Sequence, residues 1–96
     1  MHSYILSDLA DADILEIARN SVKNWGFARA ERYVMELHRT FEMLSEFPHL
    51  GRDLARVRLG YFRFEHASRS VYFQKTETGI SIVRILHKRQ HFGASA

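Results

Sequence analysis

The first part of the chain repeats apolar residues at intervals of three and four, which is the spacing of a helix with one buried face. Ser7 lies where an N-terminal cap is expected, and aspartates follow it in the first turns. The apolar positions of this stretch are Ala10, Ile14, Ile17, Ala18, Val22 and Trp25. Gly26 comes next and predicts the end of the helix.

A second stretch continues the same spacing up to Phe47, directly before Pro48, and proline disfavours a helical residue in front of it. Its apolar positions are Ala30, Tyr33, Val34, Leu37, Phe41, Leu44 and Phe47. Because few residues separate the two stretches, they should form an antiparallel helical hairpin.

After the second stretch the period changes to two, which is typical of half-buried strands. Phe62 and Phe64 lie on one side of the first such run, and Tyr61, Arg63 and Glu65 lie on the other. Ala67 and Ser68 fall where a turn is expected, and a second polar turn precedes residue 80. The strands predicted by this pattern cover residues 61–65, 69–74 and 80–87. Together they predict an antiparallel meander.

The last of these strands is apolar on both faces. Strict alternation places Ile80, Ile82 and Leu86 on one face and Val83 and Ile85 on the other, and Arg84 is the one charge inside the run. Such a strand is expected to lie between two others. The short apolar run at residues 3–6 should add another strand to the same sheet.

These patterns predict a two-layer α+β domain with an N-terminal strand, an antiparallel two-helix hairpin and a three-stranded antiparallel meander, the helices packed on one sheet face. The whole chain, residues 1–96, is expected to be one domain, because domains usually hold about 100 to 150 residues. We expect the segment from Pro48 to Gly60 to be irregular and residues 92–96 to form a flexible tail.

Composition removes several classes of function. The chain has no cysteine, so disulfides, thiolate zinc sites and a thiol nucleophile are excluded. It has no Gly-x-Ser-x-Gly turn and no glycine-rich phosphate loop, and no apolar run approaches the roughly 20 residues of a membrane span. Of the six histidines, His87 and His91 are four residues apart, but they fall at the end of a predicted strand, where this spacing does not form a helical face. We therefore expect a cytoplasmic protein without a metal or a cofactor.

Charge divides the chain into an acidic and a basic half. Residues 1–48 carry five basic and eight acidic side chains, a balance of −3, whereas residues 49–96 carry nine and three, a balance of +6. Eleven of the 14 basic residues are arginine, which suits contacts with carboxylates and phosphates. The segregation predicts a basic surface that binds a partner.

Arg63 and Arg84 fall on two of the predicted strands, and His87 ends the last one. If the two arginines share the face opposite the helices, the three residues could form a cationic groove for RNA, with His87 as general acid or base. The alternative is structural: Arg84 pairs with Glu65 or a carbonyl group, and His87 only ends a strand.

The ordered set of landmarks resembles the ParE branch of the ParE/RelE toxin superfamily over roughly residues 4–91. The N-terminal landmarks are Tyr4, Leu6, Ser7, Asp13, Ile14, Ile17, Trp25, Gly26, Ala30 and Tyr33. The C-terminal landmarks are Pro48, Gly51, Arg52, Gly60, Tyr61, Arg63, Tyr72, Ile82, Val83, Arg84, Ile85, Leu86 and His87.

This resemblance implies the toxin of a type II toxin-antitoxin pair. ParE-like toxins inhibit DNA gyrase, and so replication and growth, without being enzymes. RelE-like relatives cut messenger RNA on the ribosome, and in that alternative Arg63, Arg84 and His87 are the catalytic candidates. A third alternative is an attenuated homologue that mainly binds its antitoxin.

The resemblance also implies a cognate ParD-like antitoxin that forms a hetero-oligomer with the chain and lays an extended, commonly acidic segment over it. We expect no sequence-specific nucleic-acid binding. The candidates for contact with the target are Arg63, Arg84, His87, Lys88 and Arg89. The candidates for contact with the antitoxin are Arg52, Arg56, Arg58 and Arg69.

Overall fold

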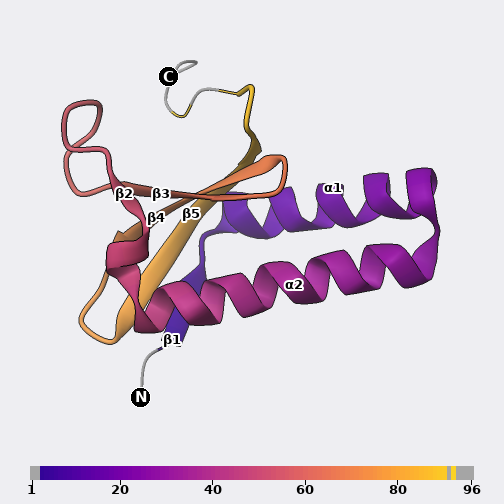
Figure 1. Ribbon diagram of the computed structural model, residues 1–96, viewed down its shortest axis with the longest axis horizontal. Coiled ribbons are helices and arrows are strands. Elements are labelled where there is room, and N and C mark those ends of the chain that lie inside the picture. Colours follow the sequence, from indigo (N-terminus) through magenta and orange to yellow (C-terminus); the bar gives the residue numbers. More distant parts are fainter. Residues whose placement is uncertain (1–2, 91, 93–96) are drawn as a thin grey trace.

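A computed structural model describes residues 3–90 and residue 92, and it confirms the α+β architecture (Figure 1). The elements in chain order are β1 (Ser3–Leu6), α1 (Asp8–Trp25), α2 (Phe27–Glu46), the 3-10 helix η1 (Pro48–Leu50), β2 (Arg52–Asp53), β3 (Phe62–His66), β4 (Arg69–Lys75) and β5 (Gly79–His87). The strands form one sheet in the order β1-β5-β4-β3-β2, in which only the β1–β5 pair is parallel. As expected, β5 has a strand on either side.

Both predicted helices form, and local capping explains where they meet. The Ser7 hydroxyl accepts a hydrogen bond from the backbone N–H of Ala10 at 3.0 Å, which satisfies one of the free donors at the start of α1. At the other end Gly26 has φ +86° and donates its N–H to the carbonyl of Val22. This left-handed conformation favours glycine and lets α2 begin at the next residue.

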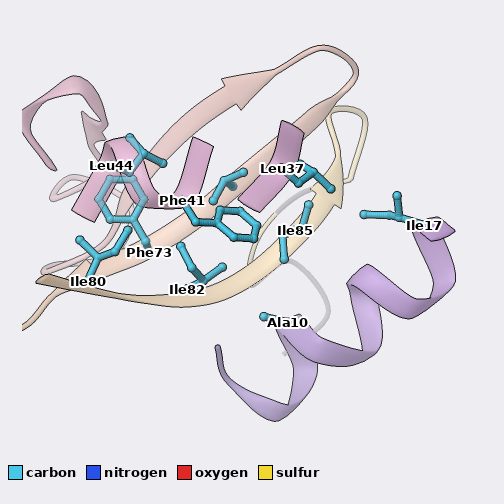
Figure 2. Packing of buried hydrophobic residues seen from close by; sticks show 10 residues of the cluster. Ala10, Ile17, Leu37, Phe41, Leu44, Phe73, Ile80, Ile82 and Ile85 are labelled. Atoms are coloured by element: carbon cyan, nitrogen blue, oxygen red, sulfur yellow. The ribbon is translucent and has the colours of Figure 1, made fainter. Parts of the chain in front are cut away.

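The core lies between the helical hairpin and one face of the sheet (Figure 2). Leu37, Phe41 and Leu44 of α2 are fully buried, and they meet fully buried Phe73 of β4. The isoleucines of β5 complete the cluster: Ile80, Ile82 and Ile85. Burying each side chain of this size stabilises the fold by about 1.5–3 kcal/mol, so this cluster holds the two layers together.

A β-bulge in β5 corrects the predicted pattern of its faces. Tyr72 of β4 pairs with Arg84, but the next residue of β4, Phe73, pairs with Ile82, so Val83 has no partner on β4. The extra residue shifts the alternation by one position. Ile85 therefore joins Ile80 and Ile82 in the core, whereas strict alternation had placed it on the other face.

The segment from Pro48 to Gly60 is more regular than predicted. It contains η1 and the two-residue strand β2, in which Arg52 pairs with Arg63 of β3. The remaining loop is closed by its own backbone, because the N–H of Leu54 donates to the carbonyl of Tyr61 at 2.9 Å. Two polar residues carry no hydrophobic period, so the sequence pattern did not indicate β2.

The far end of the hairpin extends beyond the sheet (Figure 1). Val22 and Trp25 belong to the predicted buried stripe of α1, yet 42% and 60% of their surfaces are exposed. They lack a sheet to pack against at that end of the helix. Neither described helix combines the length and apolar character needed to cross a membrane.

The expected flexible tail lies almost entirely outside the described residues, because residues 93–96 are not among them. Phe92 is described, and its ring stacks on Tyr72 of β4.

Candidate functional site

The face of the sheet away from the helices carries a row of cationic residues. Tyr72 lies between Val71 and Phe73, which both belong to the core, so the alternation of side chains places Tyr72 on the opposite face. Residues paired across neighbouring strands share a face. The pairing extends from Tyr72 to Arg84 on one side and to Arg63 and then Arg52 on the other. We call Arg52, Arg63, Tyr72 and Arg84 the open-face row.

Arg84 is held by a carboxylate of α1. Its Nε and Nη2 donate to the two oxygens of Asp13 at 2.8 and 3.0 Å, and this hydrogen bonding raises the pKa of Arg84 above its already high ordinary value. Arg84 therefore has a structural role, as the second of the two hypotheses expected. Its partner is Asp13 and not Glu65 or a carbonyl group. Glu65 instead lies 4.0 Å from the Nε of Arg63, which is an ion-pair contact too long for a hydrogen bond.

Asp13 is placed by the end of the β1–β5 ladder. The last pair of that ladder joins Leu6 to Ile82, and beyond it the start of α1 occupies the edge of β5. There Ser7 donates its hydroxyl to the carbonyl of Val83 at 2.7 Å. The N–H of Ile85 donates to Asp13 at 2.9 Å, so this carboxylate replaces the missing strand as acceptor.

His87 lies on the opposite face from the two arginines. It pairs with Arg69, which is two residues before Val71 and therefore shares the helix-facing side of the sheet. Its Nδ1 accepts the N–H of Arg89 at 3.2 Å in the turn that follows β5. The cationic groove suggested by Arg63, Arg84 and His87 is therefore not assembled.

The other expected contact residues are dispersed. Lys88 and Arg89 are exposed in the turn after β5, and the N–H of Lys88 donates to the carbonyl of Ser68. Arg56 is exposed in the loop after β2. Arg58 belongs to the same loop, and its guanidinium carbon lies 4.8 Å from the centre of the Tyr61 ring, within the range of a cation–π contact.

A groove of about 530 Å³ lies between the helical hairpin and the β3–β4 turn, and we call it the helix-side groove. Three arginines and one acid, Glu36, supply its charges. It is lined by Ser21, Trp25, Arg29, Arg32, Tyr33, Glu36, Ala67, Ser68 and Arg69. Of the expected antitoxin contacts, only Arg69 lines it; Arg52, Arg56 and Arg58 belong to β2 and the loop that follows.

Sequence reasoning did not single out Arg29 and Arg32 because they belong to the half of the chain with net negative charge. A signal was present, since both lie on the first turns of α2 within one helical turn of each other. Both follow Trp25 in the sequence. The guanidinium carbon of Arg29 lies over the exposed Trp25 ring, 5.4 Å from its centroid.

Three nitrogen atoms near these surfaces are buried without a hydrogen-bond partner among the described residues: Nε of Arg63, Nε of Arg69 and Nε2 of His66. The last of these lies 4.0 Å from a carboxylate oxygen of Glu36. Buried donors without partners cost free energy, so the surroundings of the Arg63 and Arg69 guanidinium groups favour an acceptor from elsewhere. Residues 3–90 and 92 include no group of three histidine, aspartate or glutamate side chains able to hold a metal ion.

Known proteins resemble this chain in both sequence and fold. It is 35% identical to "Toxin ParE1" of Caulobacter vibrioides, with 97% of this chain and 100% of that protein covered. It is 33% identical to "Toxin ParE1" of Mycobacterium tuberculosis, with coverages of 90% and 89%.

Two solved structures share the fold. One is described as a chromosomal ParDE TA system from P. aeruginosa, with a TM-score of 0.75 at 22% identity and coverages of 91% and 96%. The other is the toxin-antitoxin complex RelBE2 from Mycobacterium tuberculosis, with a TM-score of 0.65 at 19% identity and coverages of 90% and 96%. Residues 4–92 match the sequence pattern of the family described as "ParE toxin of type II toxin-antitoxin system, parDE". The chain therefore belongs to the ParE toxin family of type II toxin-antitoxin systems.

Proposed function

We propose that this toxin arrests growth by inhibiting DNA gyrase in the cytoplasm, without catalysing a reaction, and that a ParD-like antitoxin neutralises it. Membership of the ParE family supports the proposal that DNA gyrase is the target. The geometry favours binding over RNA cleavage, since Arg84 is engaged by Asp13 and His87 lies on the other face of the sheet.

We propose the helix-side groove as the binding site for the antitoxin, and the charge and shape of this groove are the observation that supports it. Its three arginines and exposed Trp25 would accept a segment that combines carboxylates with apolar side chains. Arg29 and Arg32 are exposed on α2 and are free to turn toward such a segment.

Charge reversal tests whether the helix-side groove binds the antitoxin. We expect the combined substitution Arg29→Glu and Arg32→Glu to weaken binding of the cognate antitoxin at least about tenfold, because acidic residues would then face like charges. Arg39→Glu is the matched control: Arg39 is exposed on the same helix but does not line the groove. Titration calorimetry measures all three proteins. Equal weakening by the control would remove the groove from the interface.

The target is tested with purified gyrase and the wild-type toxin. We expect the toxin to inhibit supercoiling and to cause cleaved DNA to accumulate, and equimolar antitoxin should reverse both effects. Growth arrest with unaffected supercoiling would contradict the gyrase proposal. If translated messages were cut at the same time, the RelE-like alternative would replace it, and absence of any arrest would favour the attenuated homologue.

A further inference from the structure

An aromatic cluster on the open face has one member from outside the sheet. The ring of Phe92 stacks on Tyr72, with centroids 4.5 Å apart and an angle of 16° between the planes. The ring centroids of Tyr61 and Phe92 lie 5.1 Å apart, and the guanidinium carbon of Arg58 lies 5.2 Å from the centroid of the Phe92 ring. Tyr72 belongs to the open-face row, yet only 4% of its surface is exposed.

A hydrogen-bonded turn reverses the chain between β5 and this ring. The side-chain oxygen of Gln90 accepts the N–H of His87 at 2.9 Å, and the N–H of Gln90 donates to the carbonyl of His87 at 2.8 Å. Phe92 comes two residues after Gln90, and its ring lies against Tyr72 of the sheet.

We propose that Tyr61, Tyr72 and Arg58 form a binding site for an aromatic side chain of a partner protein segment, and that Phe92 occupies this site in the free toxin. Phe92 shows what the site accepts, which is a flat hydrocarbon ring stacked on Tyr72 with the guanidinium of Arg58 over it.

The surroundings define the rest of the partner. Arg52 and Arg63 belong to the row that contains Tyr72, and Arg58 is itself exposed. Glu65 is the acid near this group, 4.0 Å from Arg63. The net positive charge favours acidic residues beside the incoming aromatic one.

Phe92 is suited to being displaced. Its contacts with the described residues are ring stacking and a cation–π contact, and it remains partly exposed. Aromatic pairs of this kind add only modest stabilisation beyond the area they bury. An intramolecular occupant nevertheless has a high effective concentration, so it lowers the affinity of every competitor. Only a partner whose own affinity outweighs this competition therefore displaces Phe92.

The test compares full-length wild-type protein with Phe92→Ala. The probe is a capped acidic peptide with a central phenylalanine, and its alanine counterpart serves as the control peptide. Titrations are followed through the ring signals of Tyr61 and Tyr72. We expect Phe92→Ala to bind the phenylalanine peptide about fivefold to tenfold more tightly than wild type does, because no ring has to be displaced.

Two further variants keep the result interpretable. Phe92→Tyr retains a stacking ring and should match wild type within about twofold. Adding Arg58→Ala to Phe92→Ala should weaken binding of the phenylalanine peptide by removing the cation–π contact. The proposal fails if Phe92→Ala binds no more tightly than wild type, or if both peptides bind alike. Tighter binding of oligothymidylate than of the phenylalanine peptide would assign the site to nucleobases and overturn it as well. None of these outcomes depends on whether gyrase is the target.

Discussion

Asp13 of α1 is a single carboxylate that accepts hydrogen bonds from both a side chain and the backbone of β5. It accepts two hydrogen bonds from Arg84 and a third from the backbone of Ile85. Arg84 therefore contributes to stability, and loss of toxicity in an Arg84→Ala variant would not by itself identify a target contact. Arg63 lies in the same row, and its Nε has no hydrogen-bond partner among the described residues, since Glu65 lies 4.0 Å away; it is therefore the more informative position for that purpose.

Removing the charge of Asp13 should destabilise the toxin. We expect Asp13→Asn to lower the free energy of unfolding by about 1–3 kcal/mol, because a partly buried guanidinium loses its counter-charge. In a double-mutant cycle with Arg84→Met, the two effects should be non-additive by about 1 kcal/mol or more. Urea denaturation at neutral pH measures all four proteins. Strictly additive effects would show that the pair contributes nothing.

Tyr4 and His38 form a second long-range polar contact. The Tyr4 hydroxyl and the Nδ1 of His38 lie 2.6 Å apart, and burial, with a smaller contribution from the carboxylate of Glu42, raises the pKa of Tyr4 above its usual value of about 10. The folded state therefore keeps the phenol proton to higher pH than the unfolded chain does. This part of the stability is complete below about pH 10 and is lost as pH rises through the folded-state pKa.

Tyr4→Phe separates the two roles of this hydroxyl. At neutral pH we expect the variant to lose about 1 kcal/mol of stability with the hydrogen bond. Above about pH 10 the gap to wild type should narrow, since phenylalanine cannot ionise. Urea denaturation from about pH 7 to about pH 11 follows the difference. Parallel stability curves over that range would contradict the raised pKa.

Residue types predicted local features well and distant partners poorly. Ser7 and Gly26 signal helix ends through their own backbone chemistry, and both occupy the predicted caps. Asp13 and Arg84 are 71 residues apart, and nothing in the sequence between them encodes their meeting. Only the termination of the β1–β5 ladder at Leu6 brings the carboxylate of Asp13 to the open edge of β5.

Among the elements, β1 depends on a close backbone approach. Ser3 pairs with Gly79 of β5, and a Cβ added at Gly79 would lie 1.7 Å from the carbonyl oxygen of Ser3. No side chain can move aside to relieve this clash, since the obstacle is backbone. The first strand can therefore pair with β5 only because residue 79 is glycine.

Gly79→Ala should displace β1 from the sheet. We expect it to lower the free energy of unfolding by about 3 kcal/mol or more, because the clash forces the backbone to shift. Gly60→Ala is the matched control, with φ +86° but open space around the added carbon, so it should cost only the backbone strain of about 1–2 kcal/mol. Thermal and urea denaturation compare the two. Equal losses would show that close approach at Gly79 is unimportant.

The elements themselves were largely predictable because their hydrophobic periods are long and regular. Both helices, the meander and the first strand follow from them. The bulge in β5 was not predictable, since one extra residue leaves a run that is apolar on both faces either way. The same bulge places Arg84 on the face of Arg63, but Arg84 and His87 are three residues apart after it, so alternation puts them on opposite faces with or without the bulge.

At the scale of the whole molecule, the division into acidic and basic halves does not divide the surface in the same way. The helix-side groove takes Arg29 and Arg32 from the acidic half and Arg69 from the basic half. Net charge along the sequence therefore did not locate the groove that brings these arginines together. Its location depends on the β3–β4 turn lying against the hairpin, which is a matter of tertiary packing.

The parallel pairing of β1 with β5 also orders events during synthesis. The first strand to leave the ribosome pairs with the last, from Ser3 opposite Gly79 to Leu6 opposite Ile82. Because β5 also supplies three isoleucines to the core, neither layer can be completed by a nascent chain that lacks it. A chain terminated before β5 would therefore be an unfolded fragment, because it lacks both the partner strand of β1 and the three isoleucines of the core.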